Sequence, residues 1–112
     1  MGIAAMQSGP HGTLAAGASG TAVFDLTPFF PTTGSLGNAF TLGLVGVIAT
    51  AVELGTGSGV PGSTGGLYIP GIQIVNNLVT LTVHNLGSTT SSPWSAGLLV
   101  FGSQISGQAV GI

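Results

Sequence analysis

Positive charge is missing from this sequence altogether. The 112 residues include no lysine and no arginine, and the only acidic residues are Asp25 and Glu53. An ordinary domain carries about 25 % charged residues, against 2 % here. Nucleic-acid binding is excluded because nothing can neutralise phosphates, and lysine Schiff bases and arginine clamps are excluded with it. Soluble monomers normally keep surface charge, so the sequence predicts a subunit covered by neighbours. The alternative is a lone domain solubilised by hydroxyl and amide side chains.

Cysteine is also absent, which excludes disulfides and thiolate metal sites. A zinc or calcium site needs three or four ligands, and only His11, His84, Asp25 and Glu53 are left to supply them. A Ser–His–Asp triad would lack its G-x-S-x-G turn. We therefore expect no enzyme activity, no catalytic residue, no metal and no cofactor.

Three of these side chains have structural interpretations instead. His84 is expected on the polar face of a strand, toward solvent or a neighbouring subunit. Asp25 is expected to accept hydrogen bonds at a strand end or turn. Glu53 ends an apolar run, so it is expected at the solvent rim or beside the amino terminus of a neighbouring subunit.

One long run, Ala39–Leu54, has Glu53 as its only charge. A membrane helix needs about 20 apolar residues, and no basic residue is present to set its orientation. The run is rich in β-branched residues and contains Gly43 and Gly46. We expect a core strand or strand pair that bends at these glycines, and no membrane contact.

Two further patterns could suggest ligand binding. Residues 57–62 match G-x-G-x-x-G, but no helix pattern and no acidic residue follow, so a surface loop is expected. The aromatic residues Trp94, Tyr68, Phe29 and Phe30 could stack on sugars, as in a lectin. Core or interface packing is the expectation for them.

The sequence is rich in glycine and proline, with 21 glycines and 6 prolines. Several of its segments also alternate between side chains expected to face inward and outward. Thr21–Leu26 alternates with period two, and so does the segment in which Val79, Leu81 and Val83 face one way. Asn76-Asn77 predicts a tight hairpin turn between that segment and Ile72–Val75. Ala96–Phe101 is the last predicted strand.

These strands predict an all-β fold: a single β-sandwich, jelly-roll-like, of roughly six to eight strands. The domain is expected over residues 13–103. Residues 1–12 are expected to form an extended N-terminal arm, and residues 104–112 a C-terminal tail.

Three segments carry a resemblance to known proteins: "GTLAAGASGTAVFDL", "NNLVTLTVHNLGS" and "WSAGLLVFGS". They resemble small β-sandwich structural proteins of tailed bacteriophages, namely head-decoration (cement) and head-fibre proteins. Jelly-roll subunits of spore appendages look similar, although those often use cysteines. The resemblance implies a structural role and carries over no catalytic residue.

The expected function is therefore that of a virion protein that decorates or cements a bacteriophage capsid through apolar, charge-poor contacts. Its expected partners are copies of itself, as a trimer or similar ring, and a major capsid protein, on the capsid surface. The alternative is a subunit of an extracellular filament or appendage, since head-to-tail contacts polymerise. The residues expected to contact neighbouring subunits lie in the arm and tail: Met1, Ile3, Met6, Ile105, Val110 and Ile112.

Overall fold

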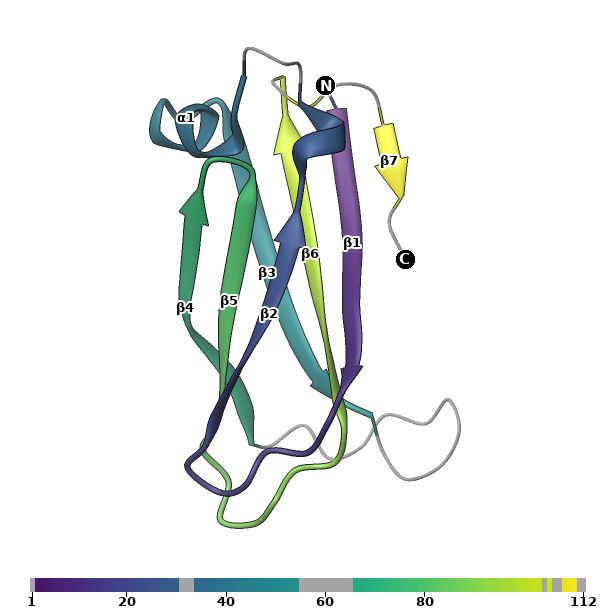
Figure 1. Ribbon diagram of the computed structural model, residues 1–112, viewed down its shortest axis with the longest axis vertical. Coiled ribbons are helices and arrows are strands. Elements are labelled where there is room, and N and C mark those ends of the chain that lie inside the picture. The colour runs from purple at the N-terminus through teal and green to yellow at the C-terminus, as the bar shows by residue number, and fades with distance from the viewer. Residues whose placement is uncertain (1, 31–33, 55–65, 104, 106–107, 111–112) are drawn as a thin grey trace.

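The protein is a sandwich of two β-sheets. The computed structural model describes residues 2–30, 34–54, 66–103, 105 and 108–110, and all statements on structure concern these residues. One sheet has the strand order β3-β6-β1-β7, and the other has the order β2-β5-β4 (Figure 1). The all-β sandwich predicted from the sequence is confirmed. The strands are β1 (Gly2–His11), β2 (Ser19–Asp25), β3 (Val45–Glu53), β4 (Leu67–Val75), β5 (Leu78–Asn85), β6 (Trp94–Gly102) and β7 (Gln108–Val110).

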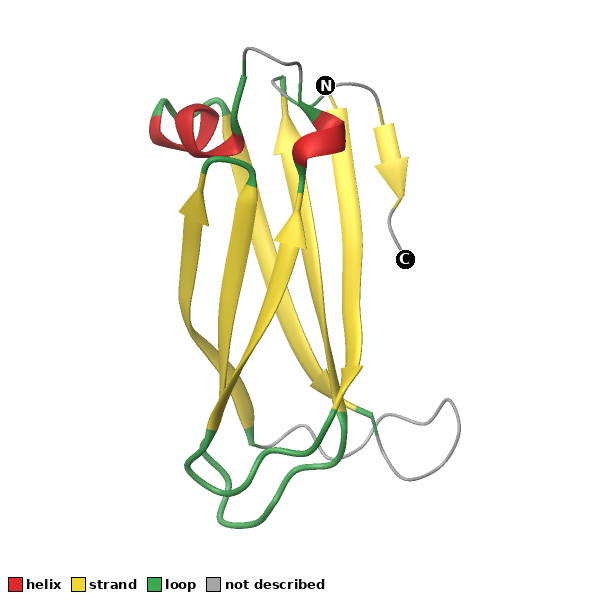
Figure 2. Ribbon diagram, viewed as in Figure 1, coloured by secondary structure: helices red, strands yellow, loops and turns green. Residues whose placement is uncertain are grey.

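The strands are nested along the chain. β4 and β5 form a hairpin in one sheet, while β3 and β6, which flank the hairpin in sequence, pair antiparallel in the other sheet. The chain therefore crosses from one sheet to the other between β3 and β4 and returns between β5 and β6. Two short helices, η1 (Thr27–Phe29) and α1 (Leu36–Thr41), lie at one end, and long loops lie at the other (Figure 2).

Side chains from both sheets meet in one core. Phe24, Val79, Leu81, Val83 and Val100 are among its most deeply buried members. Val79, Leu81 and Val83 all come from β5 and point inward, as their alternation predicts. Burying side chains of this size contributes about 1.5–3 kcal/mol each, so this core is the main source of stability.

The N-terminal segment is not the expected arm. Residues 2–11 form β1, which lies between β6 and β7 and pairs Gly2 with Gly102 at one end and His11 with Trp94 at the other. Its inward-facing Ala4 is fully buried. The backbone of β1 satisfies the N–H and C=O groups along the edge of β6, so this segment forms a strand although its inward side chains are small.

The C-terminal segment likewise returns to the sheet. Ile105 is 4 % exposed and joins the core, and β7 pairs with β1 in parallel. The tail predicted for residues 104–112 is therefore, over its described part, held against its own domain.

The long run Ala39–Leu54, in which Glu53 is the only charged residue, divides into two elements. Its first residues belong to α1, Gly43 follows with φ +75°, and β3 begins at Val45. The bend expected at Gly43 is present, but it separates a helix from a strand instead of two strands. Gly46 lies inside the continuous strand β3, with the ring of Phe101 against it.

The β4–β5 turn explains why this helix forms. Asn76 has φ 53°, as a two-residue turn at Asn76-Asn77 requires, which confirms the predicted hairpin. The turn also caps α1: Leu36 N–H donates to Asn77 Oδ1 at 2.7 Å and Gly37 N–H donates to the Asn76 carbonyl at 2.7 Å. Ser35 Oγ accepts from the next N–H, that of Asn38.

Candidate functional site

The outer face of the four-stranded sheet carries no charged side chain among the described residues. Cross-strand rows run Ile48–Leu99–Ala5 and Gly46–Phe101–Ile3. Ile48 is 52 % exposed, whereas the others are half-buried. A solvated sheet face is normally polar, so this apolar face is unusual for a surface that remains in water.

A groove continues this face toward the loop end. It has a volume of about 270 Å³ and is lined by Gln7, Thr50, Val52, Ser95 and Gly97, among others. Gly97 leaves space beside Thr50 in this groove, because a Cβ at position 97 would lie only 2.9 Å from Thr50 Oγ1. Ser95 Oγ is buried and has no hydrogen-bond partner. Such an orphan hydroxyl costs about 1–3 kcal/mol.

The opposite face, on the three-stranded sheet, is also largely apolar at its helix end. Val23, Leu78 and Val75 are about half exposed there. They share this face with Asp25, which pairs with Leu78, and with a middle band of threonines. The molecule thus has two chemically different apolar faces on opposite sides.

The residues predicted to contact neighbours fall into different environments. Ile3 lies on the outer face described above, half-buried beside Phe101. Met6 packs against the core of its own chain, and so does Ile105, which is almost fully buried. The burial of Ile105 corrects the expectation that it is free to reach a neighbour, whereas Met6 is only partly buried. Val110 belongs to β7, while Met1 and Ile112 lie outside the described residues.

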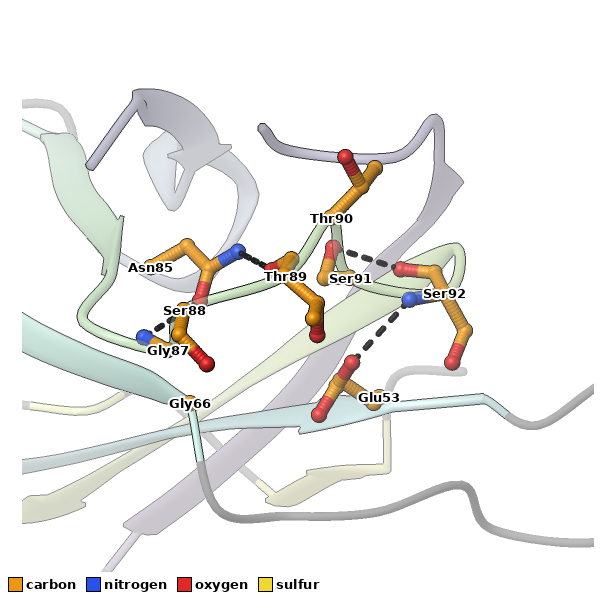
Figure 3. A pocket seen from close by; sticks show the side chains of 9 residues that line it. All are labelled: Glu53, Gly66, Asn85, Gly87, Ser88, Thr89, Thr90, Ser91 and Ser92. Atoms are coloured by element: carbon orange, nitrogen blue, oxygen red, sulfur yellow. Dashed lines mark hydrogen bonds between the residues drawn. The ribbon is translucent and has the colours of Figure 1, made fainter. Parts of the chain in front are cut away.

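A polar pocket of about 330 Å³ occupies the loop end of the sandwich (Figure 3). Asn85, 1 % exposed, organises it. Its Nδ2 donates to the carbonyls of Leu14 and Thr89 at 2.9 and 3.0 Å, and its Oδ1 accepts from Gly87 N–H at 2.8 Å. The end of β5 is thereby tied to two loops. The full lining is Glu53, Gly66, Asn85, Gly87, Ser88, Thr89, Thr90, Ser91 and Ser92.

Glu53 lies in this pocket and not at the solvent rim. It is 7 % exposed, and its Oε1 accepts a hydrogen bond from Ser92 N–H at 3.0 Å. The burial arises because Glu53 occupies an inward-facing position of β3, opposite Trp94, where the 88–92 loop closes over it.

His84 and Asp25 have the expected structural surroundings. His84 lies on the outer sheet face, hydrogen-bonded to Ser19 at 2.7 Å and in edge contact with the ring of Tyr68. Asp25 is exposed and accepts from both the hydroxyl and the N–H of Thr27, which lowers the pKa of its carboxyl below the usual value. His11 stacks on Trp94.

The aromatic residues do not form a sugar-stacking platform. Trp94 and Phe30 are buried in the core, and Phe29 packs against it. Tyr68 lies apart from them, on the outer face of the three-stranded sheet. Residues 57–62, with their glycine pattern, lie outside the described residues.

Sequence reasoning missed two residues that matter here, Asn85 and Ser95. Asn85 had a signal: a polar residue that continues the inward alternation of Val79, Leu81 and Val83 is expected to be buried. Ser95 had none, since its burial depends on the close approach of Gly9 from β1.

Comparisons with protein-family models, with curated proteins and with solved structures find no match to this chain. In the described part of the chain, no helix is long and apolar enough to cross a membrane. Nor do three or more histidine, cysteine or acidic side chains gather to hold a metal ion among these residues.

Proposed function

We propose that this protein is a structural subunit that associates with other subunits through the outer face of its four-stranded sheet. The observation that carries the proposal is the absence of charge from that face, where Ile48 is 52 % exposed and Val52 is 37 % exposed. Removing apolar surface from water stabilises a contact by about 25 cal/mol per Å² without any charge. An interface of about 1,600 Å² in total is a common size for a stable complex.

In its specific form, the proposal is that the assembly is a bacteriophage capsid that the protein decorates or cements as a trimer or similar ring. The support is the resemblance of three segments to phage head proteins, together with the near-absence of charge. The proposed partners are other copies and the major capsid protein, and the proposed location is the capsid surface.

An extracellular filament or appendage is the second candidate. It is favoured by the position of the two apolar faces on opposite sides of the molecule, because a contact between opposite faces does not close into a small ring and extends as an open fibre. A ring or a decorated shell needs no such pairing of opposite faces.

One experiment tests the proposal and separates the candidates. Ile48→Asp places a charge on the four-stranded face, and Val23→Asp, at a similarly exposed position, is its matched control on the other face. For a ring or capsid protein we expect Ile48→Asp to give monomers in analytical ultracentrifugation, while Val23→Asp still assembles. For a filament, both variants lose fibres in electron micrographs. Assembly of Ile48→Asp at wild-type concentration would contradict the proposed interface.

A further inference from the structure

Glu53 is a buried carboxylate in a chain that has no strong cation to pair with it. It is 7 % exposed, and the sequence contains neither lysine nor arginine. Buried charges in proteins are normally paired or bound to a metal, because removing them from water is costly. No cationic side chain lines the pocket around Glu53 among the described residues, which leaves the space beside the carboxylate available to a cation from another molecule.

The two histidines are engaged elsewhere. His84 is bonded to Ser19 on the outer face of the other sheet, and His11 is bonded to Ser8 and stacked on Trp94. The Ser92 N–H contacts only Oε1 of Glu53, at 3.0 Å. Among the described residues this one backbone hydrogen bond is a small compensation for a carboxylate, which has about four acceptor positions.

The space beside this carboxylate is large and lined with oxygen-bearing groups. The pocket of about 330 Å³ is walled by the hydroxyl residues of the 88–92 loop, with glycines at positions 66 and 87 where side chains would fill it (Figure 3). A Cβ at Gly66 would come within 2.7 Å of Asn85 Oδ1, so the pocket wall depends on that glycine. The hydroxyl, amide and backbone oxygens of this lining can accept hydrogen bonds from a ligand that pairs with the single carboxylate, that of Glu53.

We propose that this pocket binds the guanidinium group of an arginine side chain on a partner protein of different sequence. A guanidinium has five N–H donors in a plane, matches a carboxylate and is less strongly hydrated than an ammonium group. Carboxylate, hydroxyl and amide oxygens provide the acceptors that it needs. A second copy of this chain cannot supply the group, because it has no arginine.

A metal ion fits this pocket less well. Calcium takes six to eight oxygen ligands, usually with several carboxylates, and Glu53 is the only acidic residue in the lining. The pocket is also much larger than a single ion. The inference goes beyond the proposed self-association, since the Glu53 pocket lies away from the outer-face rows of Ile48 and Ile3.

The test is calorimetric titration of the whole protein with Nα-acetyl-L-arginine methylamide, with calcium chloride as a separate titrant. We expect saturable binding of the arginine derivative that weakens at least tenfold in Glu53→Gln. Glutamine keeps the shape and can still accept from Ser92, so this variant is expected to fold. Asp25→Asn, which removes the other, exposed acid, is the matched control and is expected to bind like wild type.

Three results would overturn the proposal: no binding of the arginine derivative, equal binding by Glu53→Gln, or binding of calcium alone. Loss of self-assembly in Glu53→Gln would also count against it, because it would indicate that a second copy covers the pocket, with its amino terminus as the cation. The assembly state of Ile48→Asp is a separate measurement, so failure of one proposal is distinguishable from failure of the other.

Discussion

The imidazole of His11 stacks on the indole of Trp94, with ring centroids 4.2 Å apart and planes inclined by 25°. The two residues are cross-strand partners at the loop end of β1 and β6, beyond a register shift that begins at Ser8. The contact thus lies at the position where β1 and β6 pair again after the bulge.

Replacing His11 by alanine is expected to destabilise the fold by about 1 kcal/mol, since an aromatic pair contributes about 0.5–1.5 kcal/mol beyond its burial. Phenylalanine at this position keeps the stacking and is expected to recover most of the loss. Urea unfolding followed by the fluorescence of Trp94, the only tryptophan, measures both. Equal stability of the alanine and phenylalanine variants would show that the stacking is not responsible.

Asn85→Ala is expected to cost about 3 kcal/mol. It removes four hydrogen bonds of a fully buried side chain, and the Thr89 carbonyl and the Gly87 N–H lose this partner. Ser88→Ala in the same pocket removes only an exposed hydroxyl and is expected to stay within about 0.5 kcal/mol of wild type. Thermal unfolding of both variants decides whether Asn85 is the residue that holds the loops.

Two buried serines are expected to respond oppositely to alanine. Ser95 Oγ has no partner, so Ser95→Ala is expected to be neutral or stabilising by up to about 1 kcal/mol. Ser91 Oγ accepts from Leu14 N–H at 2.9 Å and donates to the Ser92 carbonyl at 2.8 Å. Ser91→Ala is therefore expected to lose about 1–2 kcal/mol. A loss of similar size for Ser95→Ala in chemical denaturation would show that its hydroxyl is satisfied in solution.

The pKa of Asp25 is expected to rise toward its usual value in Thr27→Val, which removes the hydroxyl donor, the larger cause of its lowering. A lowered pKa means that the ionised form of Asp25 is more stable in the folded protein than in the unfolded chain, so it contributes to the stability of the fold. This contribution is present above the usual aspartate value of about 3.9 and is lost as the pH falls through the lower folded value. Carbon-detected NMR titration of the carboxyl checks the shift, with Thr21→Val on the same sheet face as control.

Self-association is expected to change little between low salt and about 1 M NaCl, because its proposed interface has no charges for salt to screen. Sedimentation at both salt concentrations measures this. Dissociation at high salt would contradict an apolar interface, whatever happens at the Glu53 pocket.

How far the sequence predicts this fold depends on the size of the side chains that alternate. β2 and β5 were predictable because large inward residues such as Phe24 and Leu81 alternate with polar or smaller ones, whereas β6 was predictable from its apolar run. β1 was not, because its inward residues include Gly2 and Ala4, which carry little hydrophobic signal. Pairing with β6 and β7, both distant in sequence, makes that segment a strand.

The helix α1 and the Glu53 pocket could not be predicted for the same reason: the residues that form them are far apart in the sequence. α1 has only six residues, and its first N–H groups are satisfied by Asn76 and Asn77, which no local pattern connects to it. Glu53 was expected near solvent because it ends an apolar run. Its burial depends on the 88–92 loop, and Asn85 holds that loop at a place that the sequence does not specify.

The pairing of Gly2 with Gly102 has a consequence for biosynthesis. While the chain emerges from the ribosome, β1 is made long before β6, so the four-stranded sheet cannot close until nearly all of this sequence has been translated. Pairings this remote form slowly, and waiting strands expose edges that neighbouring nascent chains can bind. Since this chain has almost no charge to repel a neighbour, it has to complete its own sheet before an adjacent nascent chain supplies the missing strand.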